Sequence, residues 1–434
     1  MNILLKNIHA ITCDGNHEVL YNTNIGISDG NIVFVSDQEK DIRQFQADRI
    51  INGKDKLAMP GLVNAHTHCS MTLLRNFAND LALHDWLYNH VFPAEAKLDQ
   101  EDIYWGAMLG IAEMIRTGTT TFADMYLFMD GVAQAVCQTG IRADLSFSPL
   151  KFVVGKPIDE THLCRTYHRD WNDKADGRIK VSVEIHSAYL YDEQSLKNAA
   201  ALAKELKTGI QIHILETERE RVETIEKYGI TPVELCDRCG IFDVPVIAAH
   251  CVHLSDSDMA LIKSKNVSVV HNPTSNLKLG SGIARIPEML ERGINVALGT
   301  DGAASNNNLD MFDEINLAAL IHKGANMNPI LINADEAVRM ATVNGAKAIG
   351  YEDRLGTIKQ GMKADLILLD IDQPHFYPLN DPIAAVAYAA HGLDVDTVIV
   401  DGNILMEGKE LKIMDLDLVK HKVKEISKRI TNES

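Results

Sequence analysis

Short apolar runs alternate with stretches of helical periodicity from about residue 57 onward, the pattern of βα units on a parallel sheet. Eight strands are predicted, at Ala58–Ala65, Thr119–Asp124, Ala143–Pro149, Lys180–Ser187, Gly209–Glu216, Pro245–Val252, Val267–Asn272 and Asn295–Thr300. The helical stretches between them include Gln100–Thr117, Gln194–Lys207, Pro232–Cys239, Ser255–Lys265 and Arg285–Arg292. Eight βα units predict a TIM barrel, although the count alone also permits a doubly wound sheet.

Both ends of the chain have strand-like patterns instead. Near the start we predict strands at Asn2–Cys13, Thr23–Ser28 and Asn31–Ser36, with a hairpin turn at Asp29-Gly30. Near the end we predict strands at Leu366–Asp370, Ala384–His391 and Val395–Val400, and then an amphipathic helix at Leu416–Arg429. The predicted fold is therefore α/β: residues 57–349 form a (β/α)8 TIM barrel, and residues 1–56 and 350–434 together build a small β-sandwich domain.

Composition and charge narrow the classes of function. The 434-residue chain is 46% hydrophobic and 24% charged, which is typical of a soluble globular protein, and no apolar run is long enough for a membrane span. The net charge of 42 − 60 = −18 argues against nucleic acid as a partner. The start lacks a secretion signal, and seven scattered cysteines fit reduced thiols, so we predict a cytoplasmic protein. The isolated pair Cys236 and Cys239 is interpreted as two ordinary thiols.

Polar residues stand at the ends of the predicted strands, where a TIM barrel carries its active site. The first strand ends in His66-Thr67-His68, and residues two apart in an extended segment point to the same side, so both imidazoles can reach one metal ion. Other strands end in His186, His213, His250 and Asp301. One such histidine alone would be interpreted as a core or loop residue. Several at equivalent strand ends predict a shared site.

His66, His68, His213 and Asp301 offer the nitrogen and carboxylate ligands that suit Zn²⁺, with Fe²⁺ and Mn²⁺ as alternatives by ligand type. A bridging lysine carbamate, used in two-metal barrels, would stand at the end of the fourth strand. His186 occupies that position, so we predict one metal ion per chain.

Such a metal lowers the pKa of a bound water, and a nearby group must carry the proton. Glu216, three residues beyond His213, is the candidate acid–base shuttle, although it could also be a helix N-terminal carboxylate. His250 could hold the hydroxide or polarise the substrate, and Asp301 could orient the water. His186 is a candidate substrate contact or a structural imidazole.

These motifs resemble the amidohydrolase superfamily. The residues that carry the resemblance are Pro60–His68, His213-x-x-Glu216, His250 and Gly299-Thr300-Asp301-Gly302. The resemblance covers nearly the whole chain and narrows to the 5′-methylthioadenosine/S-adenosylhomocysteine deaminases through Ser70–Arg75, Asp85-Trp86-Leu87, Phe92–Glu95, Asn272–Leu279 and Thr300–Asn307.

The resemblance implies a role for each matching residue. Metal ligation is implied for His66, His68, His213 and Asp301, and a hydroxide contact for His250. Proton transfer and a base contact are implied for Glu216, a second base contact for His186, and ribose or side-wall contacts for Trp86 and Glu95. Taken alone, Trp86 could equally be a core aromatic and Glu95 a solvated surface residue.

One departure concerns the 5′ end of the substrate. Family members that accept S-adenosylhomocysteine tend to carry arginines after the third strand, whereas Leu145–Phe152 contains none. Lys151 or Arg165 are candidate substitutes. Adenosine, 5′-deoxyadenosine, methylthioadenosine and S-adenosylhomocysteine all stay open as substrates.

The predicted function is a zinc-dependent hydrolytic deaminase that converts an adenosine-type nucleoside to its inosine analogue and ammonia. The same site could instead serve guanine, a triazine or another aminated heterocycle. A barrel without catalysis would be expected to lack metal ligands, and all the expected ones are present here. The resemblance also leaves open a homo-oligomer.

Overall fold

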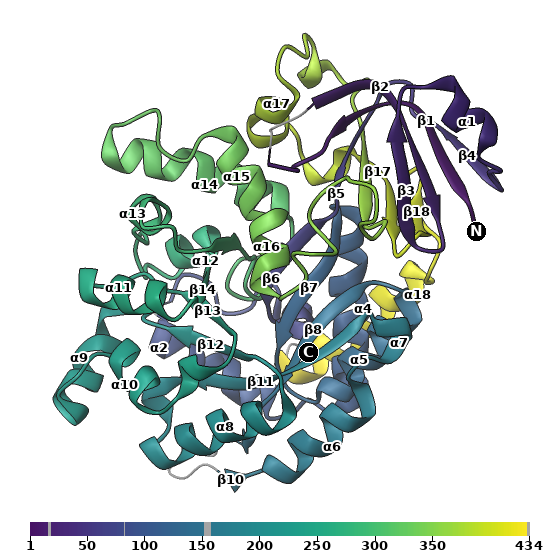
Figure 1. The fold of residues 1–434 in the computed structure, drawn as a ribbon. Helices are drawn as coiled ribbons and strands as arrows, with labels where there is room; N and C mark the ends of the chain where they lie inside the picture. The colour runs from purple at the N-terminus through teal and green to yellow at the C-terminus, as the bar shows by residue number, and fades with distance from the viewer. Residues whose placement is uncertain (16–18, 82, 152–157, 432–434) are drawn as a thin grey trace.

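The computed structural model describes residues 1–15, 19–81, 83–151 and 158–431, and its centre is a barrel of parallel strands (Figure 1). In spatial order these strands are β6 (Leu62–Thr67), β7 (Thr119–Met125), β8 (Arg142–Phe147), β11 (Ile179–Ser187), β12 (Ile210–Ile214), β13 (Val246–His250), β14 (Ser268–His271) and β15 (Val296–Leu298). Beyond the last strand, the Asp301 N–H donates to His66 O at 3.0 Å and so links β15 back to β6. The predicted barrel is confirmed.

Helices cover the outside of the barrel. They include α4 (Gln100–Arg116), α5 (Met129–Thr139), α6 (Thr161–Trp171), α8 (Glu193–Leu206), α9 (Glu218–Tyr228), α10 (Pro232–Arg238), α11 (Asp256–Ser264) and α14 (Met311–Asn326). Polar residues before several of them accept the free N–H groups of the first turn, as Asp99 does for Asp102 and Ser255 for Asp258. Within the part of the chain that the structure describes, no helix is long and apolar enough to cross a membrane.

The two ends of the chain build a second, mixed sheet, which confirms the predicted β-domain made from both termini. Its strands are β1 (Ile3–Ile11), β2 (Val19–Ser28), β3 (Asn31–Ser36), β4 (Arg49–Asn52), β5 (Lys56–Pro60), β16 (Leu366–Asp370), β17 (Val395–Val400), β18 (Asn403–Glu407) and β19 (Glu410–Leu411). N-terminal β5 pairs with C-terminal β16, which joins the two ends. The final helix, α18 (Leu416–Thr431), returns to pack against α4 (Figure 1). The bounds given for the two domains stay a prediction.

The predicted strand Ala58–Ala65 is wrong as one strand, because it is β5 and β6 in two different sheets. The break falls at Gly61, whose N–H donates to Asp365 O at 2.9 Å, while a Cβ at Gly61 would lie 2.1 Å from Thr120 Oγ1. The apolar run continues across the break because residues on both sides are buried.

The predicted strand Ala384–His391 is also wrong, because this segment contains the helix α17 (Pro382–Tyr388). Asp381 caps the helix by accepting the N–H groups of Ile383 and Ala384, at 2.9 and 3.0 Å. Pro382 occupies the first helical position, where a proline is tolerated. These helix-start signals outweigh the apolar run that suggested a strand.

A buried ion pair ties the barrel to the terminal sheet. At the start of β8, Arg142 Nε and Nη2 donate to Asp365 Oδ2 and Oδ1, at 2.9 and 3.2 Å, and the Asp401 N–H donates to Asp365 Oδ1 at 2.8 Å. Only 4% of the Arg142 side chain and 3% of the Asp365 side chain are exposed. Removing one partner therefore leaves a charge in a buried site.

We predict that Arg142→Met lowers the free energy of unfolding by about 3–5 kcal/mol, because Asp365 loses its buried cation while the apolar volume is largely kept. Urea denaturation measures the loss. The control Arg165→Met breaks the pair with Glu205, whose two side chains are about half exposed, and should cost at most about 1 kcal/mol. Equal effects of the two variants would contradict the importance of this contact.

Candidate active site

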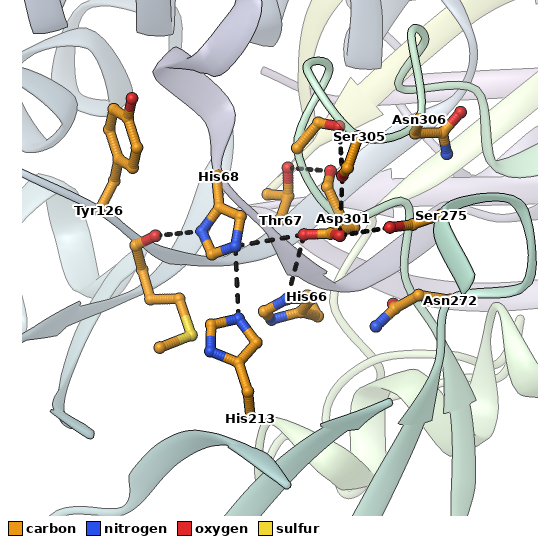
Figure 2. A network of polar contacts seen from close by, with 12 residues as sticks. His66, Thr67, His68, Tyr126, His213, Asn272, Ser275, Asp301, Ser305 and Asn306 are labelled. Atoms are coloured by element: carbon orange, nitrogen blue, oxygen red, sulfur yellow. Dashed lines mark hydrogen bonds and ion pairs between the residues drawn. The ribbon is translucent and has the colours of Figure 1, made fainter. Parts of the chain in front are cut away.

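Four side chains meet at the carboxyl end of the barrel (Figure 2). His66 and His68 come from β6 and the residue after it, His213 from β12, and Asp301 from the loop after β15. His68 Nε2 lies 3.3 Å from His213 Nε2 and 3.2 Å from Asp301 Oδ1, and His66 Nε2 lies 3.5 Å from the same oxygen. The structure therefore brings together the four residues predicted to bind metal.

Two backbone carbonyls set the protonation of this cluster. The Met125 carbonyl accepts a hydrogen bond from His68 Nδ1 at 2.5 Å, and the His186 carbonyl accepts one from His213 Nδ1 at 2.6 Å. In its neutral form each ring carries its proton on Nδ1 and presents a lone pair on Nε2. Burial disfavours the charged ring of His68, but the hydrogen bond and charge of Asp301 outweigh it and raise the pKa of His68 to about 9, so without a metal ion its Nε2 carries a second proton. Two Nε2 lone pairs facing each other at 3.3 Å repel, so this separation requires a cation between them, which is either a proton or a metal ion.

The donor atoms also fit the geometry of a metal site. Ligands about 2.0–2.1 Å from a tetrahedral zinc ion are about 3.3–3.4 Å apart, close to the separations around Asp301 Oδ1 and His68 Nε2. His66 Nε2 is buried and has no hydrogen-bond partner among the residues described. The three histidines could hold one ion, as could His66, His250 and Asp301. The residues present therefore fit a single metal ion.

The charge states of Asp301 and His66 suit metal ligation. Burial disfavours ionisation of Asp301, but the close contacts of His66 and His68, together with the charges of His68 and His250, outweigh it and hold the pKa of Asp301 well below its usual range. Burial lowers the pKa of His66 to about 4, so its ring is neutral. The second oxygen of Asp301 accepts hydrogen bonds from Ser275 Oγ at 2.6 Å and Ser305 Oγ at 2.8 Å.

The backbone is strained where the strands end. Leu215, His250 and Asp301 have φ angles of 51°, 71° and 61°, a left-handed conformation that non-glycine residues rarely adopt. Such conformations are held by the surrounding structure and cluster at functional sites. Leu215 follows β12, His250 is the last residue of β13, and Asp301 lies in the loop after β15. All three therefore change the direction of the chain at the carboxyl end of the barrel.

Glu216 and His250 lie beside one another, with Glu216 Oε2 3.9 Å from His250 Nε2. His250 Nδ1 donates to Asn276 Oδ1 at 2.8 Å. The other ring nitrogen, Nε2, is therefore the one that faces the Glu216 carboxyl group. Burial raises the pKa of Glu216, and the Glu216 N–H donates to Glu220 Oε2 at 3.2 Å. This geometry suits a carboxyl group that exchanges protons with something held between it and His250.

His186 and Glu95 lie at the edge of the cluster. The ring centroid of His186 is 4.9 Å from that of His213, and burial lowers the pKa of His186 to about 4. Glu95, the last residue of the short helix α3 (Phe92–Glu95), accepts a hydrogen bond from Tyr126 Oη at 2.7 Å. The Tyr126 ring in turn lies 6.1 Å from that of His68. Both predicted substrate contacts are thus linked to the metal cluster through neighbours.

Trp86 begins the π-helical turn Trp86–Val91, is 5% exposed, and packs into the main apolar core. Its predicted contact with the ribose stays a prediction. Of the two substitutes for the missing arginines, Arg165 bonds Glu205 on the surface of α6, and the side chain of Lys151 lies outside the described part of the chain.

The sequence reasoning assigned no role to four residues that the structure places around the cluster. Ser275 and Ser305 bind Asp301, Asn276 binds His250, and Tyr126 binds Glu95. Three of them lie within the motifs Asn272–Leu279 and Thr300–Asn307 that directly follow the seventh and eighth strands. Their place just beyond a strand end was the signal that could have found them.

The barrel with histidines and an aspartate at its strand ends defines a metal-dependent enzyme of the TIM-barrel class. A model of the amidohydrolase family matches residues 57–405. A protein of Acetivibrio thermocellus named 5-methylthioadenosine/S-adenosylhomocysteine deaminase is 60% identical, covering 99% of this chain and 100% of its own. One of the same name from Thermoanaerobacter pseudethanolicus is 48% identical over 99% of each chain. This chain belongs to the amidohydrolase family and, within it, to the family of these relatives.

Solved structures agree with this assignment. An adenosine deaminase from Xanthomonas campestris with bound zinc has a TM-score of 0.95 and 33% identity, covering 99% of this chain and 98% of that one. An atrazine chlorohydrolase from Arthrobacter aurescens complexed with zinc has a TM-score of 0.90 at 24% identity, covering 98% and 100% of the two chains. The second likeness supports the fold alone.

We predict that His213→Ala loses most of its bound metal, because one Nε2 ligand disappears and the lone pair of His68 loses its counterpart. Elemental analysis of the purified variant measures the metal content. The matched control is His322→Ala, which removes another buried histidine, on α14 and 3.3 Å from His271 Nε2. A His213→Ala protein with the metal content of the unaltered chain would contradict the proposed ligand set.

Proposed function

We propose that this protein is a zinc-dependent hydrolase that removes the 6-amino group of an adenosine-type nucleoside. The observation that carries the proposal is the 60% identity, over essentially the whole length, to a protein named 5-methylthioadenosine/S-adenosylhomocysteine deaminase. The zinc named in the similar adenosine deaminase structure supports zinc as the metal held by His66, His68, His213 and Asp301. We propose further that the protein works in the cytoplasm, which its seven free cysteines support.

A metal bound at this site would polarise a water molecule and lower its pKa, which makes hydroxide available near neutral pH. Glu216 is the proposed proton carrier. It takes a proton from the attacking water and delivers it to the ring nitrogen beside C6. It then takes the proton of the new C6 hydroxyl group and passes it to the amino group, so that the C–N bond breaks, ammonia leaves and a C6 carbonyl forms. Burial raises the pKa of Glu216 toward the working pH, where a carboxyl group can both accept and donate a proton.

The neighbouring side chains hold the reactants. His250 presents Nε2 to the oxygen that attacks C6, because its Nδ1–H is committed to Asn276. The neutral ring of His186 contacts the base, and Glu95, held by Tyr126, accepts a hydrogen bond from a ribose hydroxyl. Trp86 forms a side wall of the nucleoside pocket. Together these contacts orient a nucleoside with C6 toward the cluster and the ribose toward α3.

Other aminated heterocycles form the second group of candidates. A guanine deaminase from C. acetobutylicum and the atrazine chlorohydrolase share the fold, at 23% and 24% identity. At that level the likeness concerns the barrel only, so the nucleoside is the substrate we favour. The 5′ substituent is open among methylthioadenosine, S-adenosylhomocysteine, adenosine and 5′-deoxyadenosine.

We predict that Glu216→Gln keeps its metal but deaminates about 10²–10⁴-fold more slowly, because the amide cannot carry a proton. Ammonia release and metal content are measured on the same preparation. The control Glu218→Gln alters an exposed carboxylate two residues further along and should keep the activity. Normal ammonia release by Glu216→Gln would contradict the proposed role of Glu216 as the proton carrier.

We also predict that a deamination screen followed by ultraviolet absorbance gives higher kcat/KM for at least one of the four adenosine derivatives than for free adenine, guanine or a triazine. The physical reason is that only a nucleoside offers hydroxyl groups to Glu95. Faster turnover of a free base or triazine than of every nucleoside would overturn the substrate class while leaving the metal site intact.

A further inference from the structure

Glu314 carries a fully buried carboxyl group on α14, outside the cluster of His66, His68, His213 and Asp301. Its hydrogen bonds come from neutral donors on two separate segments. Burial raises its pKa to about 8. A buried carboxyl group is costly unless its hydrogen bonds compensate, so the contacts that it makes are expected to matter.

The first contact holds the loop after β15. Asn306 Nδ2 donates to Glu314 Oε1 at 2.7 Å and to the Thr300 carbonyl at 2.8 Å, so one amide group links α14 to the end of the barrel strand. The residue before it, Ser305, donates to Asp301 Oδ2 at 2.8 Å (Figure 2). Asn306 thus fixes the loop that carries Asp301 to α14 and to Thr300, and Ser305 fixes the Asp301 side chain within that loop.

The second contact holds the segment after β14. The Thr274 N–H, in the first turn of α12 (Pro273–Lys278), donates to Glu314 Oε2 at 3.3 Å. The next residue, Ser275, donates to Asp301 Oδ2 at 2.6 Å, and the one after, Asn276, accepts from His250 Nδ1 at 2.8 Å. One carboxylate therefore joins the two segments that orient Asp301 and His250.

We propose that Glu314 is a positioning residue that fixes these two loops against each other, so that Asp301 keeps its metal-facing oxygen and His250 its catalytic orientation. The inference rests on the roles given to Asp301 and His250 in the proposed function. Supporting residues that orient metal ligands change metal affinity or activity by about ten- to a hundredfold when they are altered.

Glu314→Gln tests this at nearly constant volume. Both oxygens of the Glu314 carboxyl group carry lone pairs and accept these hydrogen bonds, whereas a glutamine amide keeps one acceptor and turns its NH₂ group toward either Asn306 or Thr274, each of which also donates. One of the two links must therefore break. The control is Asp310→Ala, which destabilises α14 without touching either Glu314 contact. It removes the N-cap side chain that accepts the Phe312 N–H at 2.9 Å.

The measurements are the rate at which Zn²⁺-loaded protein releases zinc to a chelator, the Tm, and kcat and KM separately. We expect both variants to lower Tm. Glu314→Gln alone should release zinc about ten- to a hundredfold faster and lose kcat with little change in KM. Zinc release and kcat at the values of the unaltered protein would overturn the proposal, because a purely structural role moves only Tm.

A second variant covers the case in which Glu314→Gln does not fold. Asn306→Ala removes the hydrogen bond between Asn306 and Glu314 by altering Asn306 instead of Glu314. It should also accelerate zinc release, and unchanged release would overturn the inference. Zinc release does not depend on the substrate. If no nucleoside is deaminated by the unaltered protein, the proposed function fails, and the positioning of the metal-binding loop is still tested.

Discussion

The central constraint in this molecule is the approach of four electron-donating atoms at the mouth of the barrel. Backbone carbonyls of Met125 and His186 accept hydrogen bonds from Nδ1 of His68 and His213, so in the neutral rings the two Nε2 lone pairs point at each other across 3.3 Å. Neither ring can turn to relieve this without breaking its hydrogen bond to a backbone carbonyl. A cation between these atoms converts the repulsion into attraction, and the rest of the site is arranged around that requirement.

Closure of the barrel and assembly of the site are the same structural event. The Asp301 N–H donates to the His66 carbonyl, and Thr67 Oγ1 donates to the Asp301 carbonyl at 3.0 Å, so the last strand joins the first at two of the proposed metal ligands. The serines on the second Asp301 oxygen then set its direction. A perturbation of barrel closure should therefore also alter the position of Asp301, a proposed metal ligand.

The barrel could be predicted from the sequence because strand and helix patterns alternate regularly along the chain. In a TIM barrel the carboxyl ends of all the strands lie at one face, so residues at those ends come close together. That is why His66, His213 and Asp301 could be grouped from residues far apart in the chain. The break at Gly61 and the helix α17 were missed, since a buried apolar run looks alike across a sheet boundary and in a short helix. Glu314 could not be found this way, because its role depends on contacts between segments with no shared period.

Diffraction from crystals at the metal absorption edge tests the central claim most directly. The account predicts one anomalous peak, bound by Nε2 of His66, His68 and His213 and by a carboxylate oxygen of Asp301, at about 2.0–2.2 Å. A second ion in the cluster would contradict it. So would a peak held elsewhere, for example by the buried pair His271 and His322.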